Sequence, residues 1–132
     1  MAKVARATTH DPFATIERLR AGLPYKVLED LVTKLGLSRE EVARSIGIPP
    51  RTLIRRKHAH RLNAAESDRV HRLQEIVAST IDLLGDRDSA IHWLTTPHPA
   101  LGMTVPLSLL DTDVGAAQVR EILGRIRYGM YS

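Results

Sequence analysis

The sequence predicts an all-α protein. Helix-start and helix-stop residues recur along the 132-residue chain, and the apolar residues between them recur at spacings of three and four. No segment alternates apolar and polar residues as a half-buried strand does. A hydrophobic content of 43% and a charged content of 26% are typical of a globular protein with a substantial core. Residues 1–10 carry no such pattern, and we expect them to be disordered.

The first two helices are predicted from signals at their ends. The segment HDPFATIERLRAG has Asp11 as N-cap, Pro12 at the first helical position and Gly22 at its end. The segment LPYKVLEDLVTKLG begins at Pro24 and ends at Gly36. Its apolar residues form one stripe, which comprises Val27, Leu28, Leu31, Val32 and Leu35.

A long helix is predicted in the middle of the chain. Asn63 as N-cap, with Glu66 three residues later, opens a helix over residues 64–84. Its apolar stripe comprises Val70, Leu73, Val77, Ile81 and Leu84. This stripe serves either the core of the chain or the seam of a dimer.

The C-terminal part is also predicted to be helical. DRDSAIHWLTT predicts a short helix, PHPALGMTVP a loop and PLSLL one or two helical turns. A final helix is expected from the N-cap Thr112 to Gly129. Its apolar stripe comprises Val119, Ile122, Leu123, Ile126 and Met130.

Positive charge is concentrated in one window. The net charge is +4, and no acidic residue lies between Glu41 and Glu66, where six of the nineteen Lys and Arg are found. The remainder of the chain is slightly acidic, so the patch indicates an anionic partner, most often nucleic acid. A solvated basic surface helix is the alternative. The absence of Cys, of a long apolar run and of a signal peptide leads us to expect a cytoplasmic protein that does not enter a membrane.

The basic window contains a predicted helix-turn-helix. LSREEVARSIGIPPRTLIRRK predicts a helix with the capping box Ser38 and Glu41, a tight turn at Gly47, and a second helix. At about 100° per residue, the arc expected to pack inward comprises Pro50, Leu53, Ile54 and Lys57. The opposite arc, expected to face solvent, comprises Arg51, Thr52, Arg55 and Arg56.

Such a face suits a helix that enters the DNA major groove. Arg grips guanine bidentately and also binds phosphate. The predicted DNA-binding residues are Ser38, Arg51, Thr52, Arg55, Arg56, Lys57 and Arg61. One short recognition helix makes few contacts, so we expect a homodimer on two half-sites. A helical bundle with a basic edge would explain the same spacing.

Catalytic chemistry is scarce in the sequence. There is no GxSxG, no phosphate-cradling glycine loop and no HExxH. His58 and His60 form an H-x-H pair in a predicted polar loop, but no further metal ligand accompanies them. Asp111 and Asp113 flank a helix start and are interpreted as capping and dipole partners. We therefore expect no catalytic residue, no metal and no cofactor.

The second half resembles the C-terminal domain of Xre/MbcA/ParS-type antitoxins. The motifs that carry this resemblance are Trp93-Leu94, Pro97 to Gly102, Pro106-Leu107, Thr112 to Gly115 and Arg125 to Gly129. The pair Met103-Thr104 departs from the family pattern. GIPPRTLIRRKHAHRLNAAESDRVHRL resembles the Xre-like DNA-binding head of the same family. The resemblance covers about residues 25–132.

The resemblance implies an antitoxin of a type II toxin–antitoxin pair. Family partners are RES-domain toxins that degrade NAD⁺ or use it for ADP-ribosylation, and the antitoxin blocks the NAD⁺ pocket through its C-terminal domain. It also dimerises and represses its own operon by binding operator DNA. A stand-alone DNA-binding regulator, whose C-terminal domain only dimerises or senses a ligand, is the alternative. An enzyme acting on nucleotides would have to turn over NAD⁺ by itself, which we do not expect.

The tail RIRYGMYS is the predicted plug for the toxin. Only five aromatic residues occur in the chain, and two of them, Tyr128 and Tyr131, lie in its last five positions. Large rings and Arg side chains are common interface anchors. The predicted toxin-binding residues are Pro99, Leu101, Gly102, Arg125, Arg127, Tyr128, Gly129, Met130, Tyr131 and Ser132. In the alternatives, Tyr128 and Met130 pack on their own core, and the proline-rich loop packs Leu101 inward.

These predictions divide the chain into four parts. Residues 1–10 form the disordered N-terminus, residues 11–62 the helix-turn-helix domain, residues 63–85 the connecting or dimerisation helix, and residues 86–132 the toxin-binding domain.

Overall fold

The structure is a computed structural model that describes residues 11–129. These residues form α-helices and two short 3₁₀ helices, and they include no β-strand, only two isolated bridges. The elements are α2 (Pro12–Ala21), α3 (Tyr25–Leu35), α4 (Arg39–Ser45), α5 (Pro50–Ala59), α6 (Ala64–Leu84), α7 (Arg87–Leu94), η1 (Pro99–Leu101), η2 (Pro106–Leu109) and α8 (Asp113–Arg127). The all-α prediction is confirmed.

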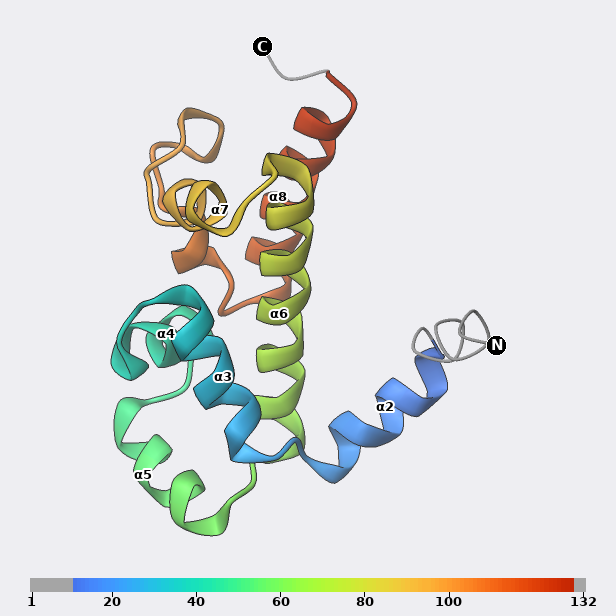
Figure 1. Ribbon diagram of the computed structural model, residues 1–132, viewed down its shortest axis with the longest axis vertical. Helices are drawn as coiled ribbons and strands as arrows, with labels where there is room; N and C mark the ends of the chain where they lie inside the picture. Colours follow the sequence, from blue (N-terminus) through green and yellow to red (C-terminus); the bar gives the residue numbers. More distant parts are fainter. Residues whose placement is uncertain (1–10, 130–132) are drawn as a thin grey trace.

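Helix α6 is the spine of the molecule (Figure 1). Helices α3, α4 and α5 lie beside its first half, and α7, the 3₁₀ helices and α8 lie beside its second half. Helix α2 leaves the body at the lower end of α6 and projects to the opposite side from α5. The fold thus places the helix-turn-helix and the C-terminal end at opposite ends of one spine.

The predicted caps form as hydrogen bonds. The carboxylate of Asp11 accepts from the Phe13 N–H at 3.0 Å, and the Thr112 hydroxyl accepts from the Gly115 N–H at 3.0 Å. Reciprocal capping boxes open α4 and α6, each with a Glu side chain at the third helical position. Because caps satisfy helix-end N–H groups locally, the sequence located these helix starts to within a residue.

One core runs through both halves of the chain. Its fully buried members come from α3, α4, α6, α7 and α8 and from the end of η2; they include Leu28, Val42, Ile46, Val70, Leu73, Ile76, Val77, Leu94, Leu110 and Val119. The α6 residues Val70, Leu73 and Val77 are therefore core residues, and only Ile81 and Leu84 at the end of the predicted stripe are partly exposed. The first three are not available as a dimer seam.

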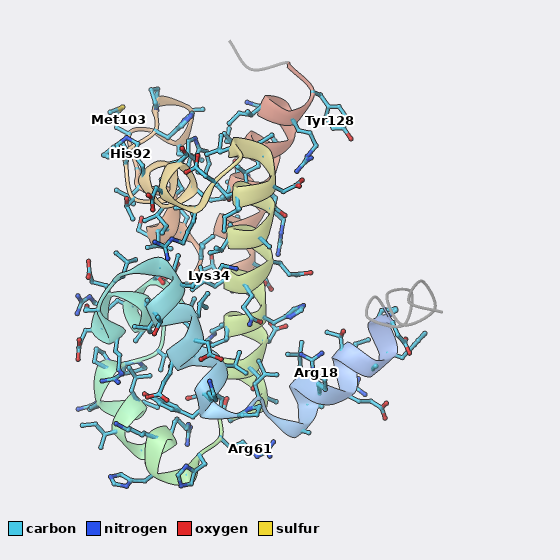
Figure 2. The ribbon with its side chains drawn as sticks, in the orientation of Figure 1. Arg18, Lys34, Arg61, His92, Met103 and Tyr128 are labelled. Atoms are coloured by element: carbon cyan, nitrogen blue, oxygen red, sulfur yellow. The ribbon has the colours of Figure 1, made fainter. Side chains whose placement is uncertain are left out.

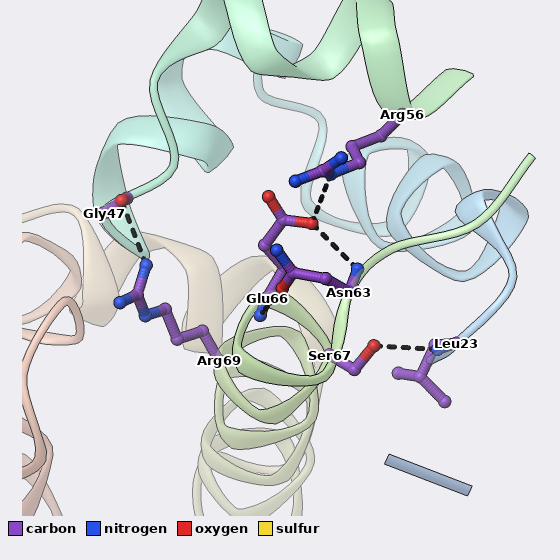
Figure 3. Close-up of polar contacts among 7 residues, drawn as sticks. All are labelled: Leu23, Gly47, Arg56, Asn63, Glu66, Ser67 and Arg69. Atoms are coloured by element: carbon purple, nitrogen blue, oxygen red, sulfur yellow. Dashed lines mark hydrogen bonds and ion pairs between the residues drawn. The ribbon is translucent and has the colours of Figure 1, made fainter. Parts of the chain in front are cut away.

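Polar bonds from α6 join the two halves. Arg72 is buried, donates to the Leu110 carbonyl at 3.1 Å and forms an ion pair with Asp113. Arg69 donates to the Gly47 carbonyl at 3.2 Å in the helix-turn-helix turn (Figure 3). Asp113 lies in the first turn of α8, where the sequence suggested a dipole partner, and its ion pair with Arg72 was not predicted.

Gly115 permits the close seating of α8. A Cβ at this position would lie 2.0 Å from the Leu109 carbonyl oxygen, well inside van der Waals contact. Gly124 on the same helix has open space around a built Cβ. The Thr-x-x-Gly motif therefore combines a cap from Thr112 with a backbone approach that any side chain would block.

Helix α2 buries none of its residues. Phe13 is 74% exposed and Ile16 is also exposed, whereas Leu19 packs partly against the core. Two apolar side chains thus face solvent on an arm that projects from the body (Figure 1). Across residues 11–129, no helix is both long and apolar enough to span a bilayer.

Candidate functional site

The helix-turn-helix forms where the sequence predicted it. Gly47 adopts φ +72° between α4 and α5, a conformation that glycine enters without steric cost. The N–H of Ile48 then bonds the Ala43 carbonyl at 2.9 Å, and the buried Ile48 and Leu53 hold α5 on the core. The backbone and side chain of Ser38 hydrogen-bond Glu41 and lower the pKa of its carboxyl, so the α4 cap is charged at neutral pH.

The exposed face of α5 differs from the predicted one. Ile54, expected to pack inward, is 65% exposed, so that prediction is wrong. Arg51, Ile54, Arg55 and His58 form an exposed stripe with spacings of three and four, within about 100° of the helix circumference. Lys57, predicted at the edge of the inward arc, is also exposed and lies outside this stripe. His58 lies in the last turn of α5 rather than in a loop. The solvent-facing stripe is thus rotated so that Ile54 replaces Arg56.

Arg56 points toward the body instead of toward solvent. Its Nε donates to Oε1 of the buried Glu66 at 2.7 Å, and the same oxygen accepts the Asn63 N–H at 2.9 Å (Figure 3). The Arg56 side chain is 23% exposed. The pair fixes the end of α5 to the start of α6, so Arg56 orients the recognition helix, and its predicted DNA contact remains a prediction.

The other predicted DNA contacts are spread around this face. Ser38 caps α4 and is exposed, while Thr52 is half-buried. Arg61 is exposed and donates to the Gly22 carbonyl of the α2–α3 connection. Lys57 is exposed and lines a surface hollow of about 300 Å³. The hollow lies between α5 and the first turns of α3 and α4, and its lining comprises Tyr25, Arg39, Glu40, Pro50, Arg51, Leu53, Ile54 and Lys57.

The C-terminal end presents an aromatic side chain to solvent. Tyr128 follows the last turn of α8 and is 77% exposed, and Figure 2 shows it pointing away from the body. Gly129 adopts φ +69° and ends the helix. The hypothesis that Tyr128 packs on its own core is therefore wrong. The predicted contacts Met130, Tyr131 and Ser132 lie outside the described residues.

The two predicted arginines of the tail already have acidic partners. Arg125 pairs with Glu121 at 3.1 Å, and Arg127 pairs with Asp82 of α6 at 3.3 Å. Beside them, a surface hollow of about 250 Å³ lies between α6 and α8. Its lining residues include Glu75, Ser79, Arg120 and Arg127. The tail thus adjoins a groove with both polar and apolar lining, in which Arg127 is already paired with Asp82.

The proline-rich loop is folded on itself. The His98 N–H bonds the Thr104 carbonyl at 3.1 Å, and the His98 ring lies 5.5 Å from Trp93. Leu101 packs partly against the core, whereas Pro99 and Gly102 are exposed. Met103, where the sequence departs from the family pattern, is exposed with φ +63°. The loop therefore combines an inward anchor with an exposed tip.

Sequence reasoning missed three contacts that shape these surfaces. The partner of Glu66, the buried role of Arg72 and the close contact of Gly115 all depend on residues distant in sequence or on backbone proximity. The ion pair of Arg56 could not be read from its neighbours in sequence, because no acidic residue lies near it. Its partner Glu66 is the first acid after this window and belongs to the next helix, α6.

Two family models match these halves. Residues 14–75 match the antitoxin Xre-like helix-turn-helix domain, and residues 79–129 match the antitoxin Xre/MbcA/ParS C-terminal toxin-binding domain. A helix-turn-helix joined to such a domain defines an antitoxin of a toxin–antitoxin system. The stand-alone regulator, in which the second half only dimerises or senses a ligand, is therefore not supported.

Relatives make the family assignment specific. An antitoxin Xre of Yersinia enterocolitica is 34% identical over 119 residues, which cover 89% of this chain and 80% of the relative. An antitoxin Xre of Photorhabdus laumondii is 33% identical over 116 residues, which cover 86% and 78%. The chain belongs to the Xre antitoxin family.

A solved structure shares the fold. A chain in the crystal structure of the M. tuberculosis MbcT-MbcA toxin–antitoxin complex superposes with a TM-score of 0.61 at 23% identity. The match covers 82% of this chain and 96% of that one.

Proposed function

We propose that this antitoxin blocks the NAD⁺ pocket of a RES-domain toxin with its C-terminal end and represses its own operon through α5. One observation carries the proposal: the exposed Tyr128 and the exposed basic face of α5 lie at opposite ends of the α6 spine. Both partners can then be engaged by one chain without competing for the same surface.

The toxin side is supported by the end of α8. When a partner buries an aromatic ring that is exposed in the free protein, the burial favours the complex. A Tyr side chain also has few torsions to fix, so binding costs little side-chain entropy. Gly129, with φ +69°, follows the end of α8 and its C-cap Tyr128. The tip of the proline-rich loop, with Pro99 and Gly102, is the second proposed contact.

The DNA side is supported by the charge of α5. Arg51 and Arg55 are exposed, and neither forms an ion pair with any acid in residues 11–129. Unpaired guanidinium groups are available for guanine edges and phosphates. Lys57 and the exposed N-cap Ser38 lie on the elements that flank the same hollow and are the proposed backbone anchors.

A homodimer is part of the proposal because one short recognition helix supplies few contacts. Val70, Leu73 and Val77 of the α6 stripe are buried within the chain, so we propose that a second copy covers the exposed Phe13 and Ile16 of α2. We expect the antitoxin to act in the cytoplasm, without catalysis of its own.

The test is a chain that ends at Arg127. We expect it to keep operator affinity and to lose neutralisation of the cognate toxin in a growth assay and an NAD⁺ consumption assay. The matched variant for the proposed dimer surface on α2 replaces both Phe13 and Ile16 by Ser. We expect this variant to bind the operator more weakly because it no longer dimerises. Full neutralisation by the truncated chain would exclude the plug.

A further inference from the structure

The most exposed part of α5 includes an apolar side chain among cations. Ile54 is 65% exposed, midway along the length of the stripe that also contains Arg51, Arg55 and His58. Single exposed apolar residues are common on proteins and need no partner by themselves. The position of this one, inside the proposed DNA-binding face, distinguishes it from the others.

The surroundings of Ile54 define what can cover it. Arg51 lies one turn before it, Arg55 follows it directly, and Lys57 lines the hollow beside it. Arg39 and Glu40 also line this hollow, but Arg39 already forms an ion pair with Glu29 at 3.5 Å. A partner that buries Ile54 must therefore bring negative charge to these cations on both sides. It must also offer a small apolar group at the level of the helix surface.

Duplex DNA meets both requirements. Its phosphates carry the negative charge, and the C5-methyl group of thymine is the apolar group that projects into the major groove. A recognition helix in that groove brings residues of its N-terminal half to the base edges, and Ile54 is the fifth residue of α5. An acidic protein surface that carries an apolar side chain would meet the same two requirements, but the match of residues 14–75 to a helix-turn-helix domain favours DNA.

We propose that Ile54 contacts a thymine methyl group and specifies a T·A pair in each half-site, next to the positions read by Arg51 and Arg55. This inference rests on the proposed operator binding. It assigns to Ile54 the selection of one base pair, whereas Lys57 and Ser38 bind the backbone independently of sequence.

The experiment uses the full-length protein and the duplex that footprinting protects upstream of its own gene. Each thymine is replaced in turn by deoxyuridine, which removes the methyl group and keeps the pairing. For the wild-type protein, we expect one substitution per half-site to weaken binding roughly three- to fivefold, the value of one buried methyl group. Ile54→Ala should weaken binding to the native duplex by at least as much and should be insensitive to deoxyuridine at that position.

Met103→Ala provides the matched control. Met103 is also an exposed apolar residue, but it lies at the other end of the molecule from α5 (Figure 2). This variant should keep both the native affinity and the sensitivity to deoxyuridine. Thermal unfolding of Ile54→Ala should match that of the wild type, because the side chain is not in the core.

Three outcomes would overturn the inference. If Ile54→Ala binds like the wild type, or retains every deoxyuridine effect, the contact does not exist. If Ile54→Ala instead weakens toxin neutralisation or dimer formation, a protein covers the residue. If footprinting finds no protected duplex upstream of the gene, operator binding fails as well. Salt-dependent binding without a methyl effect removes this inference alone.

Discussion

The two ends of the molecule carry arginines in different states. At the α5 end, Arg51 and Arg55 face solvent without an ion pair among the described residues. At the α8 end, Arg125 and Arg127 pair with Glu121 and Asp82 of the same chain. The sequence already places Glu121 one helical turn before Arg125, but only the fold brings Asp82 to Arg127.

This difference separates two modes of recognition. Free cations attract a polyanion over a distance and release its counterions on binding, so operator affinity should fall steeply with salt. Arginines already paired in water contribute little more when a partner arrives, so the toxin-binding end must rely on shape and on the exposed ring. We therefore expect a shallower salt dependence for toxin binding.

The largest effect on stability is expected at Gly115, where α8 packs closely against the backbone of Leu109. Gly115→Ala places a methyl group against the Leu109 carbonyl and should cost about 3 kcal/mol of unfolding free energy, with loss of neutralisation. Gly124→Ala on the same helix meets no atom and should stabilise by about 0.5–1 kcal/mol. Urea denaturation of both variants measures this, and equal stabilities would contradict the close approach.

The aromatic end should outweigh its arginines. Tyr128→Ala should weaken toxin binding by about 2 kcal/mol, because an exposed ring that becomes buried is a typical interface anchor. Arg127→Ala breaks an exposed intramolecular pair and should change toxin affinity by less than about 1 kcal/mol. Calorimetric titration with a catalytically inactive toxin compares them. A larger loss for Arg127→Ala would reverse the assignment.

The arginines of α5 should separate into two kinds. Arg51→Ala and Arg55→Ala should each weaken operator binding by about 1–3 kcal/mol if they contact bases, with unchanged stability. Arg56→Ala leaves the buried Glu66 without its partner and should cost about 1–3 kcal/mol of stability. Gel-shift titrations and thermal unfolding test this together. If all three behave alike, the rotated face of α5 is misassigned.

The smallest effect is expected from the dependence of stability on pH. Both halves of the molecule should contribute, through Glu41 in α4 and Asp86 at the start of α7. Backbone N–H groups of Ser38 and Ser89 hydrogen-bond Glu41 and Asp86 and lower the pKa of each carboxyl. A lowered folded pKa gives stability that is present above the ordinary values of 4.5 and 3.8 and is lost as pH falls through the folded values. Melting temperatures should therefore drop modestly below about pH 4.5. Glu41→Gln should flatten part of this drop.

The sequence by itself determined the helices and their starts. The capping boxes of Ser38 with Glu41 and of Asn63 with Glu66 act within one helical turn. A glycine such as Gly47 allows the backbone to turn locally after a helix. These are short-range effects, so a pattern of neighbouring residues contains them. The family motifs of the C-terminal half were legible for the same reason.

Only the tertiary structure decided which way α5 faces. A ten-residue helix with one strongly apolar side, Leu53, permits several rotations, and the ion pair of Arg56 with Glu66 selects one that leaves Ile54 outside. The same holds for Arg127, whose partner Asp82 lies 45 residues earlier. Charge neutralisation and burial depend on residues brought together across the core, and spacing along the chain carries no information about that distance.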